Sequence, residues 1–419
     1  MNDQAIAHFL ALEAKRQNDG IELIASENYP SRSVREAQGS ILTAKYAEGY
    51  PHHRYYGGCE VVDAVEDLAI ERAKKLFSCA YANVQPHSGS QANAAAYHAL
   101  LQPGEKVLSL VLNDGGHLTH GSPVSFSSAT YDFVFYPLNA NGHLDLAIIS
   151  RWLDQENPRL FLAGYSAYPY AIDFQGMREV IDRHNKHSQV PCLFMVDMAH
   201  IAGIVAAGLC QNPLKYADIV TSTTHKTLRG PRGGLILSNR LDLAKKIDSA
   251  VFPYTQGGPL EHVIAAKAIA FQEDLSPAFV TYMKQVLINT KACNDELARR
   301  GRIVSGTENH LFLLNVLDSY GLTGKEAQQS LESIGITTNK NMIHGDRLKP
   351  NETSGLRIGF AAATTRGCNQ EEAVRIADLI DDCLSKAKPV ETLTKEVHAI
   401  VSSWKDVMTL DFPIEEFTD

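Results

Sequence analysis

The chain has 419 residues, 44% of them hydrophobic and 21% charged, so it is long enough to bury a substantial core in two or three domains. Its formal net charge of -9 argues against a nucleic-acid-binding protein, because phosphate recognition needs a clustered basic surface. No long apolar run and no signal-peptide pattern is present, so we expect no membrane span. The seven scattered cysteines are typical of a reduced cytoplasmic protein.

The first strongly predicted element is an amphipathic helix over residues 60–77, where apolar side chains recur at helical spacing. Short apolar runs then predict buried strands at 106–112, 160–164, 192–196, 217–222 and 234–237. Strands this apolar need a sheet covered on both faces, which predicts a mainly parallel α/β domain.

The pattern changes beyond about residue 274. A long helical stretch is followed by a strand around 311–316 and a helix after Glu371, which together predict a smaller α+β part. We therefore expect an N-terminal arm and large domain over residues 1–275 and a small domain over residues 276–419.

A lysine, Lys226, lies in segment 223–234 at the exit of a predicted strand. In open parallel sheets, ligands collect at the carboxyl ends of the strands. A single loop lysine is most often solvated. A lysine that forms a Schiff base must be partly neutral, which desolvation and the neighbouring cations Arg229 and Arg232 favour. Lys226 is therefore a candidate to hold pyridoxal 5′-phosphate.

A carboxylate, Asp197, ends another predicted strand. Pyridoxal phosphate withdraws electrons only while its pyridine nitrogen is protonated, and a buried aspartate paired with that nitrogen keeps it so. An aspartate in this position can also be a helix N-cap, which is the commoner role for one found alone. The presence of Lys226 reverses that preference.

Segment 86–93 opens an alanine-rich helix with small residues. Free backbone N–H groups at such a helix start favour a phosphate, although helix capping alone would also explain the pattern.

These three segments, in this order and spacing, resemble the serine hydroxymethyltransferase family of fold-type-I pyridoxal phosphate enzymes. The resemblance runs from about residue 20 to about residue 370 and includes segments 21–28, 45–51, 54–58, 115–121 and 353–357. It implies a large domain with a mainly parallel seven-stranded sheet and a smaller C-terminal α+β domain. It also implies a homodimer, or a tetramer, with active sites shared between subunits.

The resemblance implies the roles of the individual residues. Lys226 would bind the cofactor covalently, Asp197 would pair with the pyridine nitrogen, and His117 would stack on the ring. The cofactor set is Lys226, Asp197, His200, His117, Ser90, Gly89, Ser166, Tyr46, Gly257 and Gly258. The set for the amino acid and the folate is Arg357, Ser26, Tyr56, Glu48, Tyr55, Leu112, Leu118 and Asn341, and the catalytic set is Lys226, Glu48, His117, Asp197 and Tyr56. Tyr46, Glu48, Tyr56, Gly257 and Gly258 would act in the partner's site.

The family reaction transfers the hydroxymethyl group of serine to tetrahydrofolate and leaves glycine. Five positions depart from the family pattern, namely Asp114, Tyr254, Thr255, His344 and Phe360. Tyr254 and Phe360 add bulk, which could narrow or reshape the acceptor pocket, although neutral drift explains any single change equally well. The alternative is a related enzyme with another acceptor or substrate, either an L-threonine transaldolase or aldolase, or an α-methylserine hydroxymethyltransferase.

Two further classes of protein fit the sequence less well. His117 and His120 with Asp114, or Asp197 with His200, could bind a metal, but the liganding helix pattern and any cysteine cluster are missing, so no metal is expected. A binding module without catalysis has no need of Lys226, Asp197, Glu48 and Arg357 together.

Overall fold

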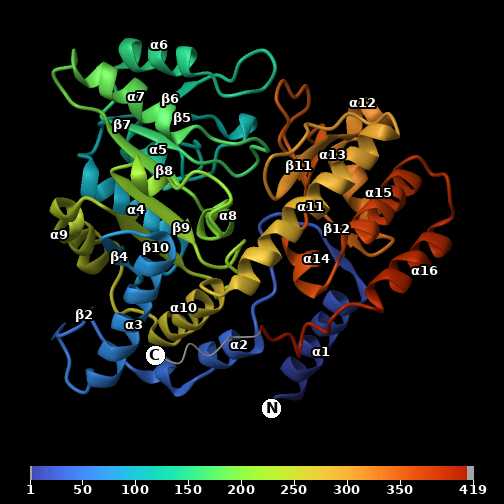
Figure 1. The fold of residues 1–419 in the computed structure, drawn as a ribbon, viewed down its shortest axis with the longest axis horizontal. Helices are drawn as coiled ribbons and strands as arrows, with labels where there is room; N and C mark the ends of the chain where they lie inside the picture. Colours follow the sequence, from blue (N-terminus) through green and yellow to red (C-terminus); the bar gives the residue numbers. More distant parts are fainter. Residues whose placement is uncertain (1, 413–419) are drawn as a thin grey trace. The chain divides into compact units, whose positions relative to one another are not determined.

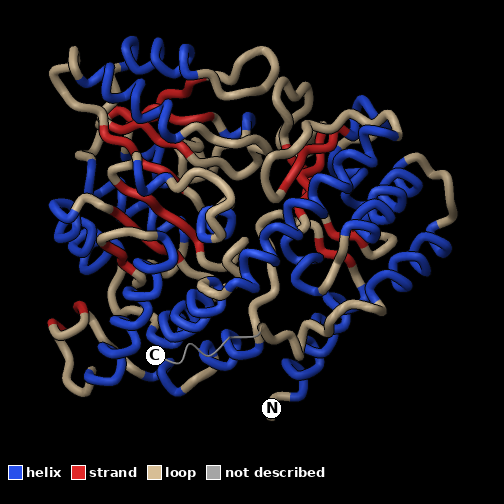
Figure 2. Tube along the Cα trace, viewed as in Figure 1, coloured by secondary structure: helices blue, strands red, loops and turns tan. Residues whose placement is uncertain are grey.

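The computed structural model describes residues 2–412 (Figures 1 and 2), which form two compact units. The first unit combines the residues up to Arg32 with residues 281–412, and the second unit is residues 33–280. The expected domain limits, 1–275 and 276–419, stay a prediction, and residues 413–419 of that range lie outside the described residues.

A seven-stranded sheet forms the centre of the second unit, in the order β4-β10-β9-β8-β7-β5-β6. The strands from β9 to β6 pair in parallel, whereas β10 runs antiparallel to both of its neighbours. Their bounds are β4 Tyr81–Asn83, β5 Lys106–Leu110, β6 Asp132–Tyr136, β7 Leu160–Ala163, β8 Leu193–Asp197, β9 Ile219–Thr223 and β10 Gly234–Ser238. The five strands predicted from apolar runs are confirmed, and so is the mainly parallel α/β fold class.

Helices cover both faces of this sheet. On one face α4 (Gly89–Leu100) and α9 (Leu241–Ser249) share a buried cluster with β5, β7, β8, β9 and β10. Side chains alternate along a strand, so Phe161 and Phe194, whose rings lie 5.6 Å apart, point to the opposite face. There α6 (Leu146–Glu156) and α7 (Phe174–Asn185) contact each other and the strands β5, β6 and β8 (Figure 1).

The remaining elements of the second unit surround this core. The predicted helix at 60–77 is confirmed as α3 (Glu60–Phe77), and it packs against α10 (Glu261–Asp274). The others are α2 Arg32–Gln38, β2 Gly49–Tyr50, β3 His53–Arg54, α5 Phe126–Thr130, α8 Ala202–Ala206, the 3₁₀ turns η1 Ile41–Ala44, η2 Leu112–Asp114 and η3 Pro213–Lys215, and the π-helical turn η4 Ala250–Thr255.

The first unit is an α+β structure around its own core. Its three-stranded antiparallel sheet has the order β11-β14-β13, and β1 pairs in parallel with β12. The strands are β1 Ile21–Glu22, β11 Leu311–Asn315, β12 Ile336–Thr337, β13 Asn339–Asn341 and β14 Gly355–Gly359. The helices are α1 Gln4–Asp19, α11 Pro277–Arg299, α12 Val316–Tyr320, α13 Gly324–Glu332, α14 Ala361–Arg366, α15 Gln370–Leu384 and α16 Val390–Val401. The predicted long helix, strand and late helix are therefore confirmed.

The buried Arg366 fastens the N-terminal arm to the rest of the first unit. Its guanidinium donates to the carbonyl oxygens of Gln17, Asn18 and Gly20 at 2.8 to 3.0 Å, and to that of Lys405 at 3.1 Å. The oxygens of Gln17, Asn18 and Gly20 lie at the C-terminal end of α1, so one side chain satisfies carbonyl groups that the helix end leaves unpaired.

Among the described residues, every helix is either too short or too polar to cross a lipid bilayer.

Candidate active site

The two residues at the centre of the predicted site lie at neighbouring strand ends. Asp197 is the last residue of β8, and Lys226 follows the end of β9, the strand that pairs with β8 in parallel. Lys226 is only 9% exposed. Its turn is closed by bonds from the Thr224 nitrogen to the Gly233 oxygen at 3.1 Å and from the Thr224 hydroxyl to the Pro231 oxygen at 2.6 Å. A buried amine therefore lies at the carboxyl edge of the sheet, as ligand binding in this fold requires.

The carboxylate of Asp197 is held in its charged form by donors from three segments. It accepts from the Asn93 amide at 2.9 Å and from the Ala199 nitrogen at 3.1 Å, and its Oδ2 lies 3.2 Å from Nε2 of His120. Burial alone raises the pKa of Asp197, but the hydrogen bond and charge of His120, with His117 and Lys226, lower it overall to well below its usual range. A permanently charged, buried carboxylate is the group that keeps a pyridine nitrogen protonated.

The glycine that directly follows β7, Gly164, fixes this geometry. Gly164 has φ of +96°, and a Cβ atom there would lie 1.9 Å from the carbonyl oxygen of Asp197. Only glycine fits both the backbone conformation and the contact.

A second loop brings His117 and Ser166 to the same strand ends. Gly115 accepts backbone bonds from Ser166 at 2.7 Å and from Ala167 at 3.2 Å, which ties the segment after β5 to the segment after β7. Nδ1 of His117 lies 2.7 Å from the Thr119 hydroxyl, and its ring is 5.4 Å from that of His120. The imidazole of His117 is thus oriented next to the Asp197 group.

The predicted phosphate turn is a tightly packed helix start. The Ser88 side chain caps α4 by accepting from the Gln91 nitrogen at 3.2 Å. A Cβ atom on Gly89 would lie 2.6 Å from the side chain of Thr223, whose hydroxyl is buried and has no partner among the described residues. Thr223 is the last residue of β9. A helix N-terminus beside an unpaired hydroxyl suits an anion.

These observations test whether pyridoxal phosphate fits the second unit. The cofactor needs an amine, an acid for its ring nitrogen, a flat partner for its ring and a cradle for its phosphate. Lys226, Asp197, His117 and the Ser88–Ser90 turn provide them, and all come from the carboxyl side of the same sheet or from the start of α4. The residues therefore fit the cofactor.

The acid/base and tyrosine residues form a separate exposed patch on the second unit. The rings of Tyr46 and Tyr56 are 5.2 Å apart, and both side chains are about half exposed. A Cβ atom on Gly257 would lie 3.3 Å from Oε1 of Glu48, and one on Gly258 would lie 3.2 Å from the Tyr46 ring. The charge of Glu48 raises the pKa of Tyr56. The patch therefore brings together the five residues that the resemblance places in a partner's site, and Tyr55 beside them is 77% exposed.

The predicted carboxylate-binding residues lie together in the first unit. Arg357 of β14 is buried, and its guanidinium donates to the Ser26 hydroxyl at 3.2 Å and to the Asn339 side chain at 3.3 Å. Burial lowers the pKa of Arg357 to about 10. The Asn341 amide donates to the Met342 oxygen at 2.6 Å, two residues along from Asn339. A guanidinium held from two sides presents its fork in a fixed orientation, which suits a substrate carboxylate.

Two of the five positions that depart from the family pattern, Phe360 and Tyr254, pack against neighbouring side chains. Phe360 is fully buried in the core of the first unit, so its ring fills that core. Tyr254 is 63% exposed, and its ring stacks on that of His98 in α4, with centroids 3.3 Å apart. Leu112 and Leu118, predicted to contact the folate, are 39% and 49% exposed, so apolar surface is present for a planar ligand.

The structure also identifies residues that the sequence reasoning missed. Asn93 links Asp197, Thr119 and Thr221 through bonds of 2.6 to 2.9 Å, and Thr223 supplies the unpaired hydroxyl. The sequence pattern suggests His120 only as a metal ligand. It does approach His117 and Asp197, with ligand atoms within 4.8 Å of one another, but these are the same groups that the cofactor ring requires.

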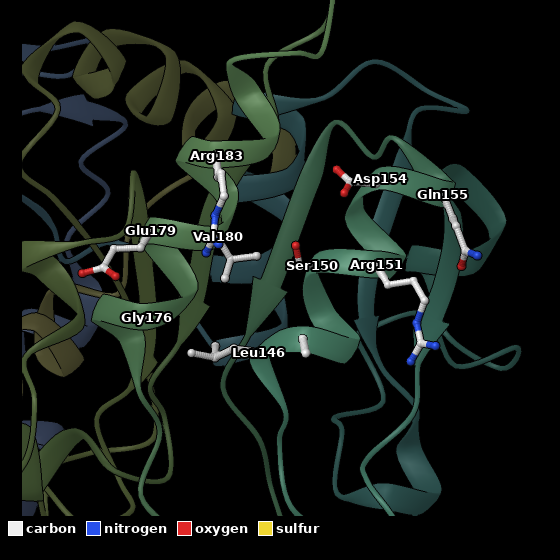
Figure 3. A pocket seen from close by; sticks show the side chains of 10 residues that line it. Leu146, Ser150, Arg151, Asp154, Gln155, Gly176, Glu179, Val180 and Arg183 are labelled. Atoms are coloured by element: carbon white, nitrogen blue, oxygen red, sulfur yellow. The ribbon is translucent and has the colours of Figure 1, made fainter.

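A surface groove of about 720 Å³ lies on helices α6 and α7 of the second unit (Figure 3). Arg151, Glu179 and Arg183 are among its lining side chains, and none of the predicted site residues contributes to it.

The fold and the site together define a pyridoxal phosphate enzyme of fold type I. The family model for serine hydroxymethyltransferase matches residues 1–380. A serine hydroxymethyltransferase of Lactobacillus johnsonii is 54% identical over 387 residues, which cover 91% of this chain and 92% of that protein. One of Lactobacillus gasseri is 54% identical over 394 residues, which cover 93% of this chain and 94% of that protein. The chain belongs to the serine hydroxymethyltransferase family.

Membership of this family confirms the predicted class of activity. Its enzymes use pyridoxal phosphate and tetrahydrofolate to interconvert serine and glycine, and the chain is a hydroxymethyltransferase of this kind. Its substrates are therefore an amino acid and a folate.

Proposed function

We propose that this chain carries out serine–glycine hydroxymethyl transfer with Lys226 as the covalent cofactor residue and Asp197 as its electrostatic partner. The observation that carries the proposal is the position of a charged Asp197 and a buried Lys226 at adjacent ends of β8 and β9. When bound, pyridoxal phosphate stabilises negative charge at the α-carbon of the substrate. The buried negative charge of Asp197 would keep the ring nitrogen protonated, because a nearby opposite charge favours the charged form of a titrating group.

Other residues of the second unit hold the cofactor in place. His117, oriented by Thr119, would stack on the ring, and Ser166 and His200 would contact its hydroxyl region. The backbone N–H groups of Gly89 and Ser90 and the hydroxyl of Thr223 hold the phosphate.

The substrate is bound and activated by the remaining set. Arg357 and Ser26 bind its carboxylate through a bidentate contact. Glu48 exchanges a proton with the serine hydroxyl. The charge of Glu48 raises the pKa of Tyr56, so Tyr56 keeps its own proton and donates a hydrogen bond to the substrate. Leu112, Leu118, Tyr55 and Asn341 contact the folate.

The protein acts as a homodimer in the cytoplasm in this proposal. Support comes from the exposed patch of Tyr46, Glu48, Tyr56, Gly257 and Gly258, because tyrosines this exposed are expected at an interface between subunits. The patch then completes the partner's site, while Lys226 and Asp197 serve the subunit's own site.

The lysine assignment is tested by trapping the cofactor. Borohydride reduction followed by peptide mass analysis will place the cofactor on Lys226, and Lys226→Ala will lose both the adduct and the visible colour. Lys245→Ala, which removes an exposed lysine of α9, will keep both. An adduct retained in Lys226→Ala refutes the assignment.

The shared site is tested by mixing subunits. Lys226→Ala and Glu48→Gln enzymes, each nearly inactive, will regain about a quarter of the wild-type rate when unfolded and refolded together, because half of the dimers then contain one intact site. No gain would show that Glu48 acts in its own subunit.

The acceptor is tested with glycine and tetrahydrofolate. The visible absorbance of the enzyme with glycine will increase at saturating tetrahydrofolate, and serine will be cleaved faster than α-methylserine or threonine. No folate-dependent increase would favour the alternative acceptors.

A further inference from the structure

Glu66 of α3 is a buried carboxylate outside the proposed chemistry. It is 1% exposed, and it accepts from Nη2 of Arg54 at 2.7 Å and from Nε2 of Gln85 at 2.8 Å. Burial raises the pKa of Glu66, and the charges of Arg54 and Lys267 oppose that effect. A carboxylate this deep needs such partners to be tolerated, so its contacts are built into the fold.

The first contact of Glu66 leads to the segment that carries Glu48. Nη1 of Arg54 donates to the carbonyl oxygens of Ala47 and Gly49, at 2.8 and 3.1 Å, and these residues flank Glu48. Nε of Arg54 bonds to Asp63 at 2.8 Å, so the guanidinium is fixed on its other side. Arg54 therefore clamps the backbone on both sides of the proposed acid/base residue.

The turn between β2 and β3, which form the hairpin that follows Glu48, has little freedom to adopt another backbone conformation. Gly49 has φ of +99°, and a Cβ atom there would lie 2.4 Å from the His53 oxygen. The Tyr55 nitrogen donates to the Glu48 oxygen at 2.9 Å. Movement of the Arg54 guanidinium would thus be passed to the Glu48 backbone.

The second contact of Glu66 leads to the phosphate turn. Gln85 stands three residues before Ser88, and its side chain also donates to the Gly49 oxygen at 2.9 Å. Lys267, 1% exposed, donates to the carbonyl oxygens on either side of Gln85, those of Val84 at 2.6 Å and Pro86 at 3.1 Å, and to that of Gly234 at 2.8 Å. Burial lowers the pKa of Lys267, and the charge of Glu66 opposes that effect.

We propose that Glu66 is a positioning residue that couples the two halves of the catalytic machinery, holding the Glu48 hairpin through Arg54 and the phosphate turn through Gln85 and Lys267. The inference rests on the proposed roles of Glu48 and of the Ser88–Ser90 turn. In the dimer the hairpin serves the partner's site and the turn serves the subunit's own site. One buried carboxylate in each subunit therefore supports both active sites.

Three variants separate the two branches. Arg54→Lys keeps the charge but cannot reach two carbonyls and two carboxylates, so kcat will fall about tenfold while the pyridoxal phosphate dissociation constant changes less than about twofold. Lys267→Met removes the donors to Val84 and Pro86, so that dissociation constant will rise about tenfold while kcat at saturating cofactor changes less than about twofold. Glu66→Gln will lower kcat about tenfold and will also raise the pyridoxal phosphate dissociation constant about tenfold.

The measurements are a spectral titration of apoenzyme with pyridoxal phosphate and steady-state kinetics at saturating cofactor. The pH–rate profile will shift in Arg54→Lys and Glu66→Gln, because Glu48 is displaced, and will not shift in Lys267→Met. The matched control is Glu71→Gln, an exposed glutamate of the same helix, which will leave all three readouts unchanged.

The inference is overturned if Glu66→Gln lowers only the melting temperature, or changes kcat without changing cofactor affinity, or the reverse. If Glu66→Gln does not fold, Glu66→Asp, which keeps the charge at a shorter reach, is measured by the same two readouts and must change both. Wild-type enzyme that binds the cofactor but does not convert serine with tetrahydrofolate would instead refute the proposed function, and the cofactor titrations would still test the Lys267 branch.

Discussion

Substitution of Glu261 by glutamine will make the stability of the enzyme less sensitive to pH. Glu261 of α10 is 1% exposed, neither carboxyl oxygen has a hydrogen-bond partner among the described residues, and its nearest cation, Arg54 at 3.5 Å, makes shorter contacts with Asp63 and Glu66. Burial, with the charge of Glu66, raises the pKa of Glu261 from 4.5 to about 8. The folded state therefore holds a proton that the unfolded state releases near pH 4.5.

The size of the effect follows from that difference in pKa. The stabilisation is fully present below pH 4.5 and is lost as the pH rises to about 8, which amounts to about 5 kcal/mol. For a chain of 419 residues this corresponds to about 5 °C in Tm. We expect Glu261→Gln to melt close to wild type at pH 5 and several degrees above it at pH 9.

Differential scanning calorimetry of both proteins with excess cofactor, at pH values from 5 to 9, measures this difference directly. Because both proteins contain excess cofactor, the pH dependence of cofactor binding cancels when their melting temperatures are compared. Glu71→Gln, at an exposed site, will follow wild type throughout. A constant difference between Glu261→Gln and wild type across this range would show that Glu261 is ionised in the folded protein, contrary to the reasoning above.

Three further substitutions test the site. Asp197→Asn will lower kcat by about 10² to 10³-fold, because the ring nitrogen loses its charged partner, and steady-state kinetics with full cofactor occupancy measures this. Gly164→Ala will lower Tm by several degrees and weaken cofactor binding, because its Cβ atom would lie 1.9 Å from the Asp197 oxygen; an unchanged melting curve would contradict that contact. Arg357→Lys will lower kcat/KM for serine by roughly 10 to 100-fold through loss of the bidentate contact with the substrate carboxylate, and a change in the KM for tetrahydrofolate alone would argue against this role.

Strand ends were the part of the site most accessible to sequence reasoning. Runs of buried apolar residues located β8 and β9, and the residues directly after such runs must lie at one edge of a parallel sheet, which identified Asp197 and Lys226. The strands that were missed lack that signal. β4 has only three residues, and β6 is an edge strand in which only the last of five residues is fully buried.

Contacts between distant segments were not accessible in the same way. Asn93 lies in segment 86–93, which predicts a helix start, yet nothing in the spacing shows that its amide reaches Asp197. Phe360 adds bulk that could reshape the acceptor pocket, but its side chain lies directly after β14 and packs in the core of the first unit. Periodicity reports which residues are buried and not which neighbours they meet.

The first unit combines an early segment of the chain with a late one, so it cannot be completed until most of the chain has been translated. Residues Ile21 and Glu22 emerge early from the ribosome, but Ile336 and Thr337, which lie opposite them in the paired strand, are among the later residues to be translated. The second unit, continuous in sequence, can complete its sheet while the N-terminal segment is still waiting. Nascent chains stalled before residue 336 would therefore expose the apolar side of that segment to chaperones, and ones released after it would not.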